Sequence, residues 1–124
     1  MKIIMLLFSM MLVGCAMAPP TQSAINGAHF DPLPATWQAD MQGIIEKDLR
    51  DPDTARFRSL TPRKGFVNYG PSSNKIHYWG YIIPVYVNVK NGFGTYTGEQ
   101  LYSFIYSGGK YIPSAMLYPW AYIE

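Results

Sequence analysis

The sequence is poor in the groups from which catalytic and metal centres are usually built. Its 124 residues include one cysteine and two histidines, His29 and His77, so an internal disulfide is excluded. No Cys/His cluster has the spacing of a metal site, and no Gly-x-Ser-x-Gly elbow, P-loop or dinucleotide fingerprint is present. We therefore expect no catalytic residues, no cofactor and no metal, and the sequence predicts a protein that is not an enzyme.

A hydrophobic run long enough to span a membrane is also missing. The apolar stretch 3–13 begins after Lys2 and is followed by Gly14 and Cys15, whereas a helix needs about 20 apolar residues to cross the hydrocarbon core. A positive charge, a short apolar run and a small residue, in that order, are typical of a secretory signal peptide. We predict that residues 1–14 are a lipoprotein signal peptide.

The end of that stretch resembles the lipobox of bacterial lipoproteins, because residues 12–15 read Leu-Val-Gly-Cys. In such lipoproteins the cysteine sulfur receives a diacylglycerol and the new terminal amine is acylated, and several chains anchor a protein far more firmly than one. The resemblance implies that Cys15 is lipidated, and Ala16 after it implies sorting to the outer membrane. The alternative is an ordinary signal-peptidase site within residues 16–18.

Charged residues are few and unevenly placed. They make up 15% of the chain, and the formal net charge of +2 does not favour a nucleic-acid partner. Acidic side chains concentrate between Asp31 and Asp53, whereas residues 56–90 contain bases and no acid. An acidic helix beside a basic sheet edge would explain this asymmetry, and a basic face for an anionic partner is the alternative.

Residues 15–35 have the composition of a tether. They contain several prolines and few large apolar side chains, and at about 3.4 Å per residue the stretch after Cys15 would reach roughly 60 Å if fully extended. Phe30 and Leu33 are the residues that could pin part of this segment to a core. We predict an acylated N-terminus and flexible tether over 15–35, followed by a single periplasmic domain over 36–124.

The start of that domain predicts one amphipathic helix. Thr36 is a suitable N-cap, and Pro52 ends the helix because it disfavours helical geometry at Asp51. Apolar side chains recur between them with the helical period, and they are Trp37, Met41, Ile44, Ile45 and Leu49. Such a stripe indicates a packing face.

Beyond residue 54 the period of the pattern changes to two, which indicates strands. The predicted strands are 55–60, 76–90, 100–107 and 110–112, with Gly108-Gly109 as a two-residue hairpin turn. The core face of the longest strand is expected to be Trp79, Tyr81, Ile83, Val85, Val87 and Val89. Pro84 is expected to mark a bulge, a bend or an edge. The predicted fold class is α+β, with one amphipathic helix packed on a three- to four-stranded antiparallel sheet.

Tyrosine is unusually abundant, with ten residues, all of them beyond the helix. Tyrosines in a small sheet serve as amphipathic cover for its core. The alternative is an aromatic recognition patch on one face of the sheet, formed by Tyr78, Tyr86, Tyr102, Phe104 and Tyr106. Both interpretations stay open at this point.

Two strings carry a family resemblance. Residues 51–57 read Asp-Pro-Asp-Thr-Ala-Arg-Phe, and residues 87–98 read Val-Asn-Val-Lys-Asn-Gly-Phe-Gly-Thr-Tyr-Thr-Gly. Together they resemble a family of small, largely uncharacterised exported proteins and lipoproteins of proteobacteria and their mobile elements. The resemblance implies an address in the cell envelope rather than an activity. Members often carry a cysteine just before the second string, where this chain has Pro84-Val85-Tyr86, so no redox role carries over.

The second string is also suited to one particular loop shape. Its asparagines can bond nearby backbone, and its glycines permit positive φ. A shaped turn between two strands is one interpretation. The alternative is a binding loop, whose candidate residues are Asn88, Asn91, Gly92, Gly94 and Tyr96.

These patterns predict a lipoprotein on the outer membrane, anchored through Cys15, with its domain facing the periplasm. We expect its partners to be the membrane, through the lipid anchor, and an envelope protein, within an envelope, secretion or conjugation assembly. A mobile-element exclusion lipoprotein, a cell-wall hydrolase and a hydrolase inhibitor are the alternatives.

Overall fold

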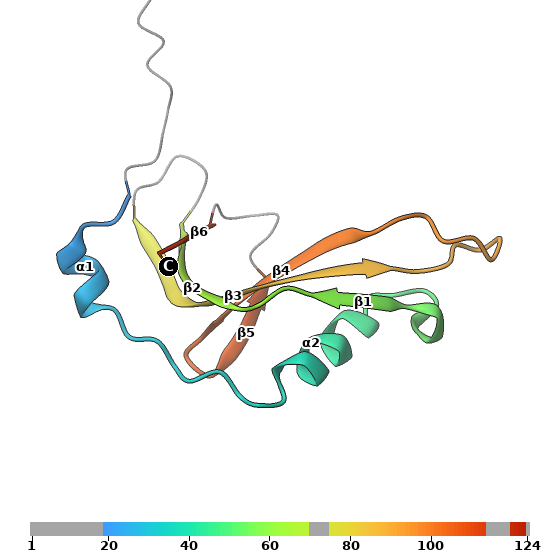
Figure 1. The fold of residues 1–124 in the computed structure, drawn as a ribbon, viewed down its shortest axis with the longest axis horizontal. Coiled ribbons are helices and arrows are strands. Elements are labelled where there is room, and N and C mark those ends of the chain that lie inside the picture. The colour runs from blue at the N-terminus through green and yellow to red at the C-terminus, as the bar shows by residue number, and fades with distance from the viewer. Residues whose placement is uncertain (1–18, 70–74, 114–119, 124) are drawn as a thin grey trace, which may run out of the picture.

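A computed structural model describes residues 19–69, 75–113 and 120–123. Cys15 and the predicted signal peptide lie outside the described residues. The described chain forms an α+β fold in which a helix packs on a six-stranded antiparallel sheet, with the strand order β5-β4-β3-β2-β6 and β1 also paired with β3 (Figure 1). The helices are α1 (Gln22–Gly27), α2 (Trp37–Glu46) and the 3₁₀ turn η1 (Pro52–Thr54), and the strands are β1 (Arg56–Ser59), β2 (Arg63–Asn68), β3 (Ile76–Asn88), β4 (Gln100–Ser107), β5 (Lys110–Pro113) and β6 (Trp120–Tyr122).

The fold class and the helix-on-sheet packing are confirmed, but the predicted number of three to four strands is wrong. The two strands that the alternation pattern missed are β2 and β6. β2 begins with Arg63 and Lys64 and then buries the four consecutive residues 65–68, so it shows no alternation of exposed and buried side chains. β6 has only three residues, which is too short for a period to be recognised.

Helix α2 begins where the sequence predicts and ends earlier. Trp37 N–H donates to the carbonyl of Pro34 at 3.1 Å, whereas the Thr36 side chain donates to Asp40 at 3.0 Å and does not cap the helix. After Glu46 the backbone tightens into an i to i+3 pattern, because Leu49 N–H donates to the carbonyl of Glu46 at 3.2 Å. The helix is thus closed by a tightened last turn, well before Pro52.

The main core lies between α2 and one face of the sheet. Met41 and Ile45 of α2 are fully buried and pack on Ile83, Val85 and Val87 of β3. These β3 residues belong to the predicted core face, which is therefore confirmed there. Trp79 of the same predicted set instead packs near the start of β3, where its ring contacts Phe66 and Phe30.

The register between β3 and β4 contradicts the predicted aromatic patch. Phe104 lies opposite Ile83, so it points to the helix-covered face, and both Phe104 and Tyr106 are buried in the main core. Tyr78 and Tyr86 alternate with the Ile83 position along β3 and lie on the other face. The five aromatic residues therefore do not share a surface, and part of the tyrosine content serves as core.

A second, smaller core lies on the opposite face, where Val67, Ile82 and Ile105 are buried. Two glycines face each other beside it, because the register pairs Gly65 of β2 with Gly80 of β3. A Cβ at Gly80 would overlap the carbonyl oxygen of Tyr106, and a Cβ at Gly65 would overlap Ile82 and the carbonyl of Ala121. This pair lets the backbones approach closely, and the first half of β3 curves away from its second half here (Figure 1).

Pro84 lies inside one continuous strand, although it lacks a ladder donor. On the side of β3 away from β4, β1 ends opposite Val85 and β2 begins opposite Ile82. The carbonyl of Pro84 points to this side, where it accepts from Leu60 N–H at 3.0 Å. In an antiparallel ladder the N–H and C=O of one residue point to the same neighbouring strand. The N–H that Pro84 lacks would therefore point to the segment that connects β1 and β2. No ladder hydrogen bond is lost there.

The described part of the predicted tether is docked on the sheet. Phe30 lies edge-on to Trp79 and Tyr81, with centroid distances of 6.2 and 6.4 Å, and Leu33 packs against the main core. The segment also contains α1, whose first turn is capped by the Thr21 hydroxyl accepting from Ala24 N–H at 3.2 Å. Phe30 and Leu33 thus hold this segment against the domain, as the sequence suggested they could. Residues 19–35 run along the domain instead of extending from it.

Candidate functional site

The two strings that carry the family resemblance meet in the structure. Thr54, from the first string, accepts a hydrogen bond from Lys90 N–H through its hydroxyl at 3.1 Å. Its carbonyl accepts from the Tyr96 hydroxyl at 2.9 Å. The loop between β3 and β4 is therefore fastened at its base to η1, which lies 36 and 42 residues away in sequence.

Asn91 fixes the shape of the loop tip. Its side-chain oxygen accepts from Phe93 N–H at 2.9 Å and from Thr95 N–H at 3.1 Å. Its own N–H donates to the carbonyl of Thr95 at 2.8 Å, and its carbonyl accepts from Gly94 N–H at 3.0 Å. Gly94 has a φ of 75°, which a residue with a side chain adopts only at a cost. These bonds form a longer glycine-containing loop and not a two-residue hairpin.

Asn88 holds the returning side of the loop. Its side-chain oxygen accepts from Gly98 N–H at 3.1 Å, and Lys90 and Tyr96 form an isolated antiparallel bridge. Of the predicted loop residues, Asn88, Asn91, Gly94 and Tyr96 thus act together to set one conformation.

Gly92 does not fit the expected pattern. Its φ is not positive, and a Cβ at this position would lie 3.5 Å from the Arg50 guanidinium, which is an ordinary contact distance. Neither the backbone conformation nor the available space therefore requires glycine at position 92.

Phe93 is the feature of this loop that the sequence analysis missed. It lies at the tip, between Gly92 and Gly94, and its side chain is 94% exposed. A phenylalanine in a loop with no core to enter is the signal that could have identified it. Because the neighbouring backbone is fixed by Asn91, the ring projects from a defined position.

Arginine side chains stack on tyrosines beside the loop. The guanidinium of Arg56 lies 3.9 Å from the centre of the Tyr96 ring, and the Lys90 ammonium lies 5.5 Å from it. Arg58 donates two hydrogen bonds to Glu99, at 2.9 and 3.1 Å. This pair lowers the pKa of Glu99 below its usual value and raises the pKa of Arg58. The base of the loop thus carries charge of both signs.

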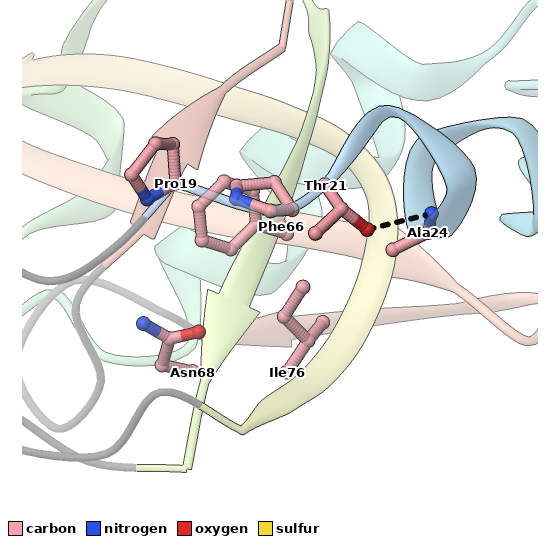
Figure 2. A pocket seen from close by; sticks show the side chains of 7 residues that line it. Pro19, Thr21, Ala24, Phe66, Asn68 and Ile76 are labelled. Carbon is pink, nitrogen blue, oxygen red and sulfur yellow. Dashed lines mark hydrogen bonds between the residues drawn. The ribbon is translucent and has the colours of Figure 1, made fainter.

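A pocket opens at the other end of the domain, beside α1 (Figure 2). Its volume is about 240 Å³ and its lining is mostly apolar. Asn68 is the most deeply buried polar residue of the lining, with 2% exposure. The lining residues are Pro19, Pro20, Thr21, Ala24, Phe66, Asn68 and Ile76.

Within residues 19–69, 75–113 and 120–123, no three His, Cys, Asp or Glu side chains lie together as metal ligands would. In the same part, the helices are all too short or too polar to cross a bilayer.

Comparisons of the chain with protein-family models, curated proteins and solved structures find no match. The family resemblance of residues 51–57 and 87–98 therefore stays a prediction.

Proposed function

We propose that the protein is an outer-membrane lipoprotein, anchored through Cys15, whose periplasmic domain binds an envelope protein through the loop 88–98. Phe93 is the anchor of this interaction. The observation that carries the proposal is a nearly fully exposed aromatic ring on a loop whose conformation is fixed by its own hydrogen bonds.

The energetics of binding support a role for Phe93. Removing a phenylalanine side chain from water contributes about 1.5–3 kcal/mol of favourable free energy. The exposed ring of Phe93 gains none of this free energy in the isolated domain, so it remains to be gained on binding. Ordering a loop on binding costs free energy, and the bonds of Asn91 and Tyr96 have already imposed that order. The flanking residues Gly92 and Gly94 also let a partner backbone come close to the ring.

The position of the loop in the fold supports a partner away from the anchoring membrane. α1, which begins three residues after Pro19, lies at one end of the long axis, and the loop between β3 and β4 lies at the other end (Figure 1). Only residues 16–18 separate Cys15 from Pro19, a reach of roughly 14 Å at 3.4 Å per residue. An anchor at Cys15 would hold the α1 end close to the membrane and leave the loop end free for a partner.

The anchor is tested by Cys15→Ser in cells fed a palmitate analogue. We expect label on the wild-type protein and none on the variant, which should remain unprocessed or become soluble. Undiminished label on the Ser variant would contradict lipidation at this residue.

The binding loop is tested by Phe93→Ala after extraction of the envelope in mild detergent. We expect the wild type to retain a stoichiometric envelope protein and Phe93→Ala to lose it. Leu60→Ala is the matched control, because Leu60 is also an exposed apolar residue but lies between β1 and β2. Equal retention by Phe93→Ala and the wild type would contradict the role of the loop.

A further inference from the structure

We propose that the open edge of β1 binds an acidic segment of the partner protein in extended conformation. This inference rests on the proposed function of the loop 88–98, and it names the chemistry of the partner that the loop binds. The edge adjoins that loop, because Arg56 at the start of β1 stacks on Tyr96 at the loop base.

β1 is an edge strand whose outer side is open. It pairs with β3, and the described strands include none on its other side. Leu60 N–H donates to the carbonyl of Pro84, and the residues of an antiparallel strand alternate in the side to which their backbone groups point. The N–H and C=O of Phe57 and Ser59 therefore point outward, away from β3. An extended peptide can pair with such an edge as an additional strand.

The side chains on this edge carry positive charge. Arg56 lies opposite Asn88 in the register of β1 and β3, on the face that α2 does not cover, and Arg58 lies on the same face two residues further on. Arg58 is held by Glu99, whereas Arg56 makes no ion pair with any described residue. Residues two apart on a strand are about 7 Å apart, so acidic side chains at alternate positions of an added strand would match both arginines.

The distribution of charge over the fold also favours an acidic partner. The described strands contain no aspartate or glutamate, and their basic residues are Arg56, Arg58, Arg63, Lys64 and Lys110. The acidic residues concentrate instead between Asp31 and Asp53, on α2 and the segments beside it. Arginines on a short edge keep uncharged and basic strands, including a second copy of β1, from pairing with it. An acidic strand is the partner against which this protection does not act.

The backbone of the edge favours a polypeptide over other anions. A lipid headgroup or a free anion could meet the guanidinium of Arg56 but would leave the outward N–H and C=O groups of Phe57 and Ser59 unpaired. A strand pairs with these groups and places its alternate side chains on the face that carries the arginines. Both features of the edge are then used at once.

The experiment measures binding of labelled peptides to the full-length protein in an uncharged detergent, by fluorescence anisotropy. The probe is a peptide of about ten residues, the upper length of ordinary strands, that alternates Glu with Val, and its counterpart alternates Lys with Val. We expect the Glu peptide to bind and the Lys peptide not to bind. Arg56→Glu should weaken binding of the Glu peptide about tenfold, because a favourable cross-strand pair becomes a repulsive one. Arg56→Gln, which removes the charge without reversing it, should cause a smaller loss.

Two controls separate strand pairing at this edge from a general attraction of charges. Lys110→Glu makes the same change of net charge as Arg56→Glu, at an exposed position on β5 across the sheet from β1, and should leave the affinity unchanged. A Glu peptide that is N-methylated at its four central residues lacks the donors that strand pairing needs, and it should not bind. A contact that depends on charge alone would retain this peptide.

The proposal is overturned if the Glu peptide does not bind, if Arg56→Glu and Lys110→Glu weaken its binding equally, or if the N-methylated peptide binds as well as the unmodified one. Vesicles of anionic lipid that bind through Arg56 when the Glu peptide does not would assign the charge to a membrane surface. If the peptide fails but Phe93→Ala still loses the envelope protein, this inference fails while the proposed function stands. If the peptide binds through Arg56 but Phe93→Ala retains the envelope protein, the role of the loop fails while the edge remains a binding site.

Discussion

At the scale of single residues, Gly94 is the position where loop conformation can be tested most directly. Its φ of 75° lies in the left-handed region, and no neighbour within 4 Å would clash with an added Cβ. We predict that Gly94→Ala lowers the free energy of unfolding by about 1 kcal/mol through backbone strain alone. Urea unfolding followed by circular dichroism measures the difference.

Gly43→Ala is the matched control for that prediction. Gly43 is exposed in the middle of α2, has ordinary φ and also has open space around it. Alanine there should stabilise the domain by about 0.5–1 kcal/mol, because glycine is entropically unfavourable in a helix. A Gly94→Ala variant as stable as the wild type would show that the loop does not need this conformation.

The candidate site illustrates how far residue types alone predict function. Asn88, Asn91 and Gly94 are recognisable because asparagine and glycine have local conformational preferences. The attachment of Tyr96 to Thr54 is not recognisable, since it joins residues 42 apart in sequence. The place of Phe93 between two glycines of a loop is readable from the sequence, but the exposure of its ring is a property of the fold.

At the scale of elements, the docked N-terminal segment makes a testable prediction. Phe30 packs on Trp79 and Tyr81, and Asp31 accepts a hydrogen bond from Gly109 N–H at 3.2 Å. We predict that Phe30→Ala lowers stability by about 2 kcal/mol, less than a fully buried phenylalanine because the side chain is half-buried. Limited proteolysis should then cut within residues 19–33 at least tenfold faster.

Ser23→Ala, in the same segment but exposed, should leave the proteolysis rate unchanged. Unchanged cleavage of Phe30→Ala would mean that the ring does not hold the segment on the sheet.

The elements differ in how well the sequence predicts them. β4 has the predicted bounds, 100–107, and its hairpin to β5 turns at Gly108 and Gly109, both with positive φ, because local turn chemistry sets that register. β2 and β6 depend instead on tertiary contacts, since their pairing brings Gly65 against Tyr122, which is distant in sequence. α1 has no buried residue, so no apolar stripe indicates it.

At the scale of the whole molecule, the two cores explain why one sheet has residues buried on both faces. α2 covers Ile83 and Val85, while the curvature at Gly65 and Gly80 encloses Ile82 and its neighbours on the other side. Alternation of polar and apolar residues predicts one buried face per strand. This prediction fails here because the curved sheet buries residues on a second face. The same curvature gives the domain its two dissimilar ends.

The stability of the whole domain should depend on pH at both extremes, for different reasons. The pKa of Asp31 is lowered by its hydrogen bond to His29, and the pKa of Glu99 is lowered by Arg58. Groups with lowered pKa stabilise the fold above their unfolded pKa of about 4, and this contribution is lost as pH falls further. Glu99 is exposed and Asp31 is partly exposed, so the loss on the acid side should be modest and reduced by salt.

Tyr111 and Tyr122 act on the alkaline side, because burial raises the pKa of both tyrosines. For Tyr111 the 2.7 Å hydrogen bond to Asp40 raises the pKa further. The fold therefore favours the neutral phenol, and this contribution is complete below the unfolded pKa of about 10 and is lost as pH rises above it. We predict that the melting temperature falls above pH 10 and that Tyr111→Phe flattens this fall while lowering stability at pH 7 by about 1 kcal/mol. Tyr102→Phe, which removes a partly buried hydroxyl with no described hydrogen bond, should leave the alkaline fall unchanged, whereas an equally steep fall in Tyr111→Phe would assign it to other groups.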